Sequence, residues 1–272
     1  MNAIRGDLAD IALAGKYFAP HYSSPQPFSL QAPRTAIRAK GDHASVAVSE
    51  LLHGELFHAI DVAGGWAWGY SAHDHYVGYV PVDLLADPVE PTHIVTAPAA
   101  LVFAEANIKS PEKARLPMGS RVAGEIEGDF LKTGEGFVHL RHLSTVGALE
   151  KDPVAIAERL TSAPYLWGGR SSDGLDCSGL IQLCLSLCGM QAPRDTDQQM
   201  AELGEEIETE APLKRGDIVF FPGHVGFMAD SDNLIHANAH WMQVTTESLA
   251  DVVARLADAH AQPVLARKRI RL

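Results

Sequence analysis

The sequence predicts an α+β protein in which two small β units precede a domain that has its helices first and its sheet after. Short runs rich in Val, Trp and Tyr, interrupted by glycines, fill residues 36–86, as is typical of short β-strands. Similar runs fill residues 92–143. After residue 150 the pattern changes, because apolar helical runs come first and short strand-like runs follow.

The two β units share the order of their glycine turns. In each, a glycine precedes one strand, a second glycine turn opens the next strand at an aromatic residue, and a Gly-aromatic-Val run closes the unit. This order resembles the bacterial SH3-like barrel, so two such barrels are expected. The turns are Gly54, Gly64-Gly65-Trp66 and Gly78-Tyr79-Val80 in the first unit, and Gly119, Gly128-Asp129-Phe130 and Gly136-Phe137-Val138 in the second.

Prolines mark the boundaries between the expected parts. A helical pattern over residues 7–17 and a Pro- and Ser-rich stretch over residues 21–33 predict an N-terminal helix and an irregular arm. Asp87-Pro88-Val89-Glu90-Pro91 is typical of a linker. The predicted parts are the helix and arm at 1–33, the first barrel at 34–87, the second barrel at 92–145 and the C-terminal domain at 150–272.

The C-terminal domain is predicted to begin with two helices. Pro153 suits the first turn of a helix that runs to about residue 160, and Gly189 ends a second apolar run that starts at Cys177. A glycine-rich loop lies between them at 167–174. The later apolar runs at 217–221, 225–229, 233–237 and 264–270 predict strands.

The composition excludes several classes of partner. A formal net charge of −12 leaves no basic surface for nucleic acid or anionic lipid. No run approaches the ~20 apolar residues of a membrane span, and the first residues lack a signal-peptide core. Three clustered cysteines do not form a disulfide framework. We therefore expect a cytoplasmic chain with reduced thiols, and a monomer is the working expectation.

Cys177 is the candidate nucleophile. It follows a glycine-bearing loop and opens an apolar helical run, and a helix N-terminus favours the thiolate, which is the attacking species. The alternative is a buried, inert thiol. Asp176, Ser178 and Gly179 argue against it because they are polar or small, whereas Cys184 and Cys188 lie among leucines and are expected in the core.

His224 is the candidate base, because it begins a predicted strand directly after a Pro-Gly turn. His236 lies on the next predicted strand, and a hairpin would bring it behind His224. His224 would take the thiol proton and His236 would orient its imidazole. The alternative for each is an ordinary core or surface histidine, of which a chain with 13 histidines has several.

A zinc site is the rival interpretation of the same residues. Cys177, His224 and His236 could offer three ligands. Cys184 lies seven residues further along the helix, roughly 10.5 Å away, and no Cys-x-x-Cys or His-x-x-x-His pair occurs. We therefore expect no metal and no cofactor.

Taken together, these pieces resemble the NlpC/P60 cell-wall peptidases over about residues 150–270. The family's papain-like fold and Cys-His-polar triad would be carried by Cys177, His224 and His236, and Tyr165 matches the tyrosine on the oxyanion side. The matching runs are Pro164-Tyr165-Leu166-Trp167-Gly168-Gly169, Asp176-Cys177-Ser178-Gly179-Leu180, Pro193-Arg194-Asp195-Thr196, Leu213-Lys214-Arg215-Gly216-Asp217-Ile218-Val219-Phe220-Phe221, Gly223-His224-Val225-Gly226 and Ile235-His236-Ala237.

The preceding β units make the resemblance narrower, to the gamma-D-glutamyl-L-diamino acid endopeptidases of murein-peptide recycling. That branch implies that Glu50, Tyr76 and Asp195 hold the free amine of the substrate's L-Ala, since an ammonium needs a carboxylate partner. From their own surroundings, Glu50 would be a solvated surface acid and Tyr76 an aromatic at the barrel rim.

Further substrate contacts are expected beside the nucleophile. Asp176 and Ser178 flank it, and Thr196 follows Asp195. Trp167 suits either core packing or a pocket wall.

The implied activity is hydrolysis of the bond between D-Glu and a diamino acid in a murein peptide, L-Ala-gamma-D-Glu followed by meso-diaminopimelate or Lys. Two alternatives stay open. One is another papain-like reaction, by an amidase or acyl transferase. The other is a module in which SH3-like barrels bind the cell wall and catalysis is secondary.

Overall fold

The computed structural model describes residues 2–208 and 210–271. The chain divides into two compact units, Met1–Val146 and Gly147–Leu272, and each is described by itself. Within the described ranges, no helix is both long and apolar enough to span a membrane.

The first residues form strands where a helix was predicted. Residues 7–17 contain β1 (Leu8–Asp10) and a single 3-10 turn, η1 (Ile11–Leu13). The backbone of β1 pairs in parallel with β2 (His21–Ser23), and the Asp10 carboxylate accepts a hydrogen bond from the Ala12 N–H at 2.9 Å. The helix prediction was wrong because the distant partner strand takes the hydrogen bonds that a helix would have made locally.

The first barrel is built on a seven-stranded antiparallel sheet in the order β5-β4-β8-β7-β6-β3-β9. It takes in β3, which precedes residue 34, because β3 pairs with both β6 and β9. Its core contains Leu30, Leu51 and Phe57. The strands are β3 (Gln26–Leu30), β4 (Arg34–Arg38), β5 (Ala47–Leu52), β6 (Leu56–Ala63), β7 (Trp66–Ser71), β8 (Val77–Pro81) and β9 (Leu85–Ala86), with η2 (Val82–Leu84) before β9.

The second β unit has two small sheets, in the orders β13-β10-β17 and β12-β11-β16-β15-β14. Both are antiparallel and enclose one core that contains Val102, Leu116 and Val138. The elements are β10 (His93–Val95), β11 (Ala99–Phe103), β12 (Glu112–Pro117), β13 (Arg121–Val122), β14 (Glu125–Glu127), β15 (Phe130–Lys132), β16 (Phe137–His139), η3 (Leu140–His142) and β17 (Leu143–Thr145).

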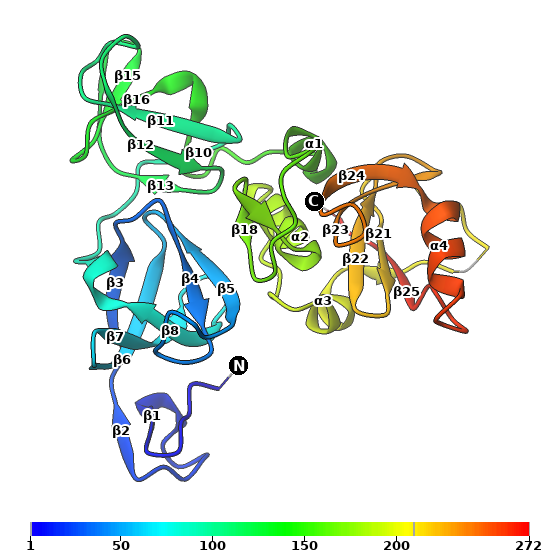
Figure 1. The fold of residues 1–272 in the computed structure, drawn as a ribbon, viewed down its shortest axis with the longest axis horizontal. Helices are drawn as coiled ribbons and strands as arrows, with labels where there is room; N and C mark the ends of the chain where they lie inside the picture. Colours follow the sequence, from blue (N-terminus) through cyan, green and yellow to red (C-terminus); the bar gives the residue numbers. More distant parts are fainter. Residues whose placement is uncertain (1, 209, 272) are drawn as a thin grey trace. The chain divides into compact units, whose positions relative to one another are not determined.

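The C-terminal unit has a six-stranded antiparallel sheet in the order β20-β25-β21-β22-β23-β24 (Figure 1). Its helices are α1 (Pro153–Arg159), α2 (Cys177–Leu187), α3 (Thr196–Glu202) and α4 (Leu249–Ala257). Its strands are β18 (Arg170–Ser171), β19 (Gly174–Leu175), β20 (Glu205–Glu206), β21 (Ile218–Phe221), β22 (His224–Met228), β23 (Asn233–Asn238), β24 (Gln243–Ser248) and β25 (Ala266–Arg269).

Helices cover both faces of this sheet. Val219 and Phe221 alternate along β21 and share a core with Val252 of α4, while α2 packs against β22 and β23 (Figure 1). Because α2 is buried along almost its whole length, the position of its first residue is fixed against the sheet. The predictions of α1, α2 and the strands at β21, β22, β23 and β25 are confirmed within a few residues.

Candidate active site

The start of α2 is set by the Asp176 side chain. One carboxylate oxygen accepts the Gly179 N–H at 2.7 Å and the other accepts the Gly168 N–H at 2.9 Å, so Asp176 caps the helix and ties it to the glycine-rich loop. A side chain at Gly179 would place its Cβ 2.2 Å from the Gly169 carbonyl oxygen. Glycine at 179 is therefore required for the loop to pass close to the helix end that carries Cys177.

Arg194 holds this helix cap from the other side. Its guanidinium donates to both oxygens of Asp176, at 2.9 and 2.5 Å, and to the Ser178 hydroxyl at 2.9 Å. Asp176, Ser178 and Arg194 are all buried. Asp176 and Ser178 thus hold the nucleophile's surroundings in place, and their contact with substrate stays a prediction.

Cys177 is the first residue of α2, and it is only 6% exposed. Burial and the neighbouring Asp176 carboxylate raise the pKa of the thiol, whereas the Thr196 hydroxyl and the N–H groups of Ser178 and Val225 oppose that rise. The Thr196 Oγ1 lies 3.9 Å from Sγ. The thiol is therefore protonated at rest, among groups that would stabilise its thiolate, and needs a base to activate it.

Tyr165 lies in the stretch that precedes the glycine-rich loop. Its backbone N–H donates to the Met242 carbonyl at 2.9 Å, which fixes it against the loop between β23 and β24. Burial first, and then the charge that Cys177 would carry as a thiolate, raise the pKa of Tyr165 to about 12. The phenol close to Cys177 therefore keeps its proton at neutral pH and is available as a hydrogen-bond donor.

His224 and His236 meet as the sequence predicted. His224 begins β22, His236 lies on the neighbouring β23, and His224 Nε2 is 2.7 Å from His236 Nδ1. A Cβ at Gly226 would lie 2.9 Å from the His236 Cβ, so the glycine between them leaves room for this approach. Because α2 packs against β22, and the Val225 N–H acts on the Cys177 thiol, the base strand and the nucleophile adjoin.

Both imidazoles are held neutral. Burial first, and then the His236 ring, lower the pKa of His224 to about 3, although Glu247 opposes the shift. Burial also lowers the pKa of His236, whereas the hydrogen bond that His236 makes to the Glu247 carboxylate raises it. A protonated thiol beside a neutral imidazole is the arrangement in which the imidazole acts as a general base.

Comparisons with known proteins give this arrangement a family. Residues 162–258 match the NlpC/P60 family, and residues 37–85 match the bacterial dipeptidyl-peptidase SH3 domain. The chain carries an NlpC/P60 domain. The chain thus carries a domain similar to the NlpC/P60 family at 162–258, preceded by a domain similar to the bacterial SH3 domain at 37–85.

Curated relatives agree with this assignment at low identity. The chain is 27% identical over 179 residues to a protein named Dipeptidyl-peptidase 6 of Lysinibacillus sphaericus, and this match covers 64% of each chain. It is 28% identical over 166 residues to a Bacillus subtilis protein named Gamma-D-glutamyl-L-lysine dipeptidyl-peptidase, and this match covers 55% of each chain. The matches thus span less than two thirds of the length of either relative.

A solved structure shares the fold. The crystal structure of an NlpC/P60 family protein from Bacillus cereus superposes with a TM-score of 0.77 at 16% identity, covering 90% of this chain and 99% of that one. The α+β prediction, with an NlpC/P60 domain after SH3-like β units, is confirmed.

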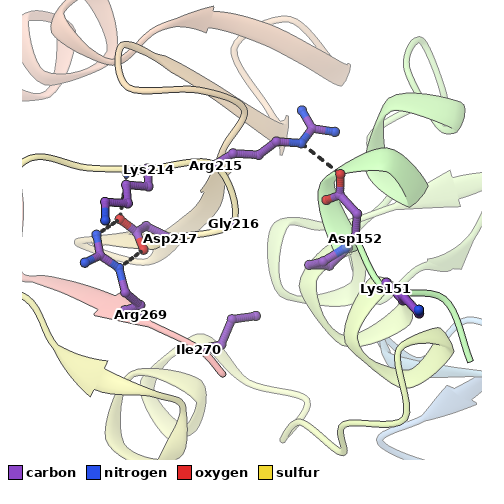
Figure 2. A pocket seen from close by; sticks show the side chains of 9 residues that line it. Lys151, Asp152, Lys214, Arg215, Gly216, Asp217, Arg269 and Ile270 are labelled. Carbon is purple, nitrogen blue, oxygen red and sulfur yellow. Dashed lines mark hydrogen bonds and ion pairs between the residues drawn. The ribbon is translucent and has the colours of Figure 1, made fainter. Parts of the chain in front are cut away.

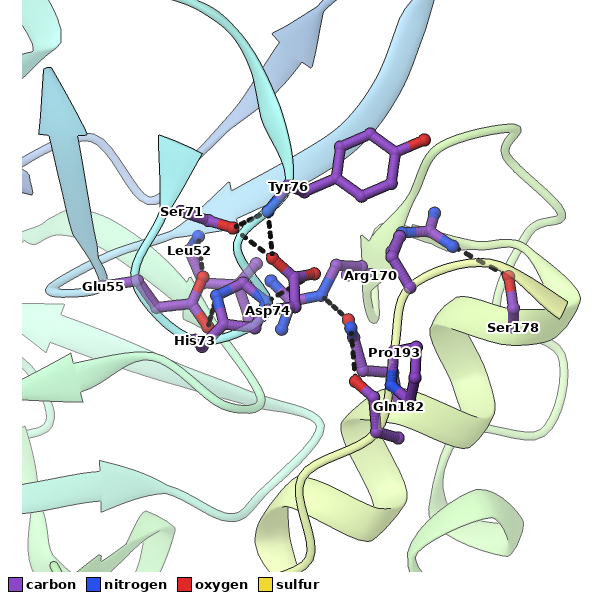
Figure 3. A network of polar contacts seen from close by, with 12 residues as sticks. Leu52, Glu55, Ser71, His73, Asp74, Tyr76, Arg170, Ser178, Gln182 and Pro193 are labelled. Atoms are coloured by element: carbon purple, nitrogen blue, oxygen red, sulfur yellow. Dashed lines mark hydrogen bonds and ion pairs between the residues drawn. The ribbon is translucent and has the colours of Figure 1, made fainter. Parts of the chain in front are cut away.

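The residues expected to hold the substrate amine belong to both units. Glu50 lies on β5 of the N-terminal unit, where its carboxylate pairs with Arg34 at 2.7 Å. The Tyr76 N–H is held by the Ser71 hydroxyl and the Asp74 carboxylate, each at 3.1 Å (Figure 3). Asp195 precedes α3 in the NlpC/P60 domain. Glu50 is not a solvated surface acid, and amine binding by the three residues stays a prediction.

The NlpC/P60 domain also places beside the candidate site a residue that the sequence analysis did not identify. Glu247 on β24 lies 2.9 Å from His236 Nε2, and it is paired with Arg255 of α4. Nothing local in Thr246-Glu247-Ser248 distinguishes this acid from a surface glutamate; only the register of β23 against β24 brings it to the histidines.

Trp167 is 66% exposed, so core packing was the wrong alternative for it.

A surface pocket elsewhere in the domain is not the catalytic site. Figure 2 shows it between Lys151 and Asp152 on one side and Lys214, Arg215 and Arg269 on the other. Its arginines are already paired, Arg269 with Asp217 at 2.6 Å and Arg215 with Asp152 at 2.8 Å. Across the described ranges no cluster of three or more His, Cys, Asp or Glu side chains is arranged to hold a metal ion.

Proposed function

We propose that this peptidase hydrolyses the bond between the gamma-carboxyl of D-Glu and the following diamino acid in murein peptides. The coarse activity follows from the NlpC/P60 domain. The finer substrate is supported by a relative named Gamma-D-glutamyl-L-lysine dipeptidyl-peptidase and by the SH3 match that accompanies the domain.

The observation that carries the proposal is the pair of histidines at 2.7 Å beside a helix that begins at Cys177. In the first step, His224 takes the thiol proton and Cys177 Sγ attacks the gamma-carbonyl carbon. Charge then develops on the carbonyl oxygen, where the Tyr165 hydroxyl and N–H groups at the start of α2 are the available donors.

The second half of the reaction returns every group to its resting state. The imidazolium of His224 gives its proton to the leaving amine of the diamino acid, and a thioester remains on Cys177. His224 then takes a proton from water, the hydroxide attacks the thioester, and the carboxylate product leaves as the thiol regains its proton.

The proposal is tested by mass spectrometry of the products from L-Ala-gamma-D-Glu-L-Lys and from the meso-diaminopimelate analogue. The wild type should release L-Ala-gamma-D-Glu, and Cys177→Ala should release none. Cys188→Ala is the matched control, since Cys188 ends the same helix far from the loop and should leave activity unchanged. Turnover by Cys177→Ala at the wild-type rate would reject the thiol mechanism.

We further propose that the substrate must carry a free L-Ala amine, as in murein-peptide recycling, and that the enzyme works in the cytoplasm. An N-acetyl group removes the positive charge that a carboxylate partner would bind. A loss of at least about a hundredfold in kcat/KM is expected, at roughly 1.4 kcal/mol per factor of ten. The comparison uses the free tripeptide, its N-acetyl form and an intact sacculus; equal rates on the first two would remove the amine requirement and leave the thiol mechanism standing.

A further inference from the structure

Glu247 continues the line of contacts that runs from His224 through His236. It lies on β24, and its Oε1 is 2.9 Å from His236 Nε2. Two further groups hold the same carboxylate. Arg255 of α4 donates to Oε1 at 2.6 Å and to Oε2 at 3.1 Å, and the indole N–H of Trp241 donates to Oε2 at 3.3 Å.

The chemistry of these partners fixes the direction of the hydrogen bonds. Arg and Trp side chains can only donate, so both oxygens of Glu247 must accept. Burial raises the pKa of Glu247, but Arg255, Trp241 and His236 together lower it to about 2, so the carboxylate is ionised. An ionised carboxylate has no proton to give, and His236 Nε2 must therefore carry the hydrogen in its contact with Glu247.

The tautomer of the second ring follows from that of the first. In a neutral imidazole only one nitrogen carries hydrogen, so His236 Nδ1 is an acceptor once Nε2 is a donor. His224 Nε2, at 2.7 Å, must then donate to it. This leaves the lone pair of His224 on Nδ1, which is the nitrogen free to take the proton of the thiol.

Arg255 has a second effect, through its charge. A lone carboxylate beside His236 would favour the imidazolium form, in which both ring nitrogens donate and Nδ1 can no longer accept. The guanidinium 2.6 Å from Glu247 opposes this. The titratable and charged groups that act on the two rings are the other histidine, Glu247 of β24 and Arg255 of α4, with Asp251 acting on Arg255. Cys177 of α2 adjoins β22 through the Val225 N–H.

We propose that Glu247, held by Arg255 and Trp241, is a positioning residue that sets the tautomers of His236 and His224 so that His224 Nδ1 accepts the Cys177 proton. This inference rests on the proposed thiol mechanism. The alternative is a purely structural role, in which Glu247 and Arg255 only join β24 to α4. Their loss would then lower stability without changing the histidine tautomers.

Glu247→Gln tests the proposal because it keeps the shape and removes the all-acceptor character. The new amide N–H₂ faces donors in either orientation. In the first orientation it replaces Oε2 and faces Arg255 and Trp241. In the second it replaces Oε1 and faces Arg255 and His236. The second orientation forces His236 to accept at Nε2, so His224 ends with its hydrogen on Nδ1. We expect kcat to fall on the order of 10–100-fold with KM changed less than about threefold.

Two measurements on the full chain separate this effect from simple destabilisation. Nitrogen NMR of isotope-labelled histidines, assigned with His236→Asn, should show the Nε2–H tautomer for His224 and His236 in the wild type and a mixture in Glu247→Gln. The rate of iodoacetamide alkylation at Cys177, located by peptide mass spectrometry, should fall in parallel. Glu158→Gln is the control, because Glu158 pairs with an arginine in the same two-pronged way but contacts no histidine.

Alkylation and NMR need no substrate. An error in the proposed substrate therefore cannot be mistaken for an error in the proposed role of Glu247. Wild-type tautomers in Glu247→Gln, or an unchanged alkylation rate, would overturn the proposal.

If Glu247→Gln unfolds, Arg255→Met provides the second test. It should leave the tautomers intact at high pH and move the acidic limb of the alkylation profile to higher pH, because His236 then becomes easier to protonate. An unmoved limb would contradict the role of Arg255.

Discussion

At the scale of single residues, His224 and His236 do different work although they share one hydrogen bond. In the proposed mechanism His224 moves the proton, so its loss removes the base itself. With the proposed tautomers, the part of His236 toward His224 is to accept a hydrogen bond from its Nε2, and another acceptor could replace it in part. The two positions should therefore differ strongly in their tolerance of substitution.

We predict that His224→Ala lowers kcat by about 10²–10⁴, whereas His236→Asn lowers it by about ten- to a hundredfold. The Asn side chain retains an oxygen that can accept from His224. The measurement is steady-state hydrolysis of the free tripeptide, with circular dichroism to verify folding. If His236→Asn proves the more damaging of the two, the roles assigned to the rings are wrong.

At the scale of elements, the ends of α2 and β22 decide the geometry of the site. The N-terminus of α2 depends on a buried ion pair, Arg194 with Asp176, because the capping carboxylate would otherwise lie inside the protein without a cation. Arg215 makes a comparable set of bonds to Asp152 and Glu158, but in the open, where each side chain is more than a third exposed.

This contrast predicts different energetic costs for the two arginines. Arg194→Met should lower the free energy of unfolding by about 3–5 kcal/mol, because it leaves Asp176 buried without its cation. Arg215→Met should cost no more than about 1 kcal/mol, since water already solvates its partners. Urea denaturation of both variants tests the prediction, and equal costs would mean that burial does not set the strength of these pairs.

The close pairing of β22 and β23 predicts a defect without unfolding. Gly226→Ala would place a Cβ 2.9 Å from the His236 Cβ, so His236 must shift away from His224. We expect kcat to fall on the order of tenfold, since effects of this size follow from loss of a hydrogen bond that orients a functional histidine. Gly134→Ala is the control, because nothing lies within 4 Å of its Cβ. Full activity in Gly226→Ala would show that the sheet absorbs the methyl group.

Element prediction from sequence succeeded where the signal was local. The helix at α2 has an apolar run bounded by a capping Asp and a glycine, and it was predicted at its observed limits. The N-terminal strand β1 was mistaken for a helix because its partner is not its neighbour in sequence. The sequence analysis did not predict α4. Its apolar residues nevertheless have helical spacing, at Leu249, Val252, Val253 and Leu256.

At the scale of the whole molecule, His224 and His236 link stability to pH. The folded-state pKa values of His224 and His236 are lowered, so the unfolded chain binds more protons between those values and the ordinary 6.5. The stability that they contribute is present above about pH 6.5 and is lost as pH falls through their folded-state pKa values. The raised pKa of Cys177 acts in the opposite direction, and its contribution is lost as pH rises above 9.0.

We therefore predict that the free energy of unfolding of the C-terminal unit is greatest between about pH 6.5 and 9. Urea titrations across pH, followed by hydrogen-exchange mass spectrometry of peptides from β22 and β23, measure it. His236→Asn should flatten the acidic slope, since one of the two groups that gain a proton on unfolding is gone. An acidic slope as steep in His236→Asn as in the wild type would assign the effect to other groups.

The sequence by itself determined the order of the β units and the final domain, and it predicted the candidate nucleophile, its candidate base and the histidine behind that base. Each of these depends on near neighbours: a helix that starts after a glycine loop, or a strand that starts after a Pro-Gly turn. Only the tertiary structure decided that Glu247, Arg255 and Trp241 complete the histidine line and that Arg194 secures the helix cap. A charged side chain has the same local sequence signal whether it ends in water or against a buried ring, and only the register of the strands and the packing of the helices separate the two cases.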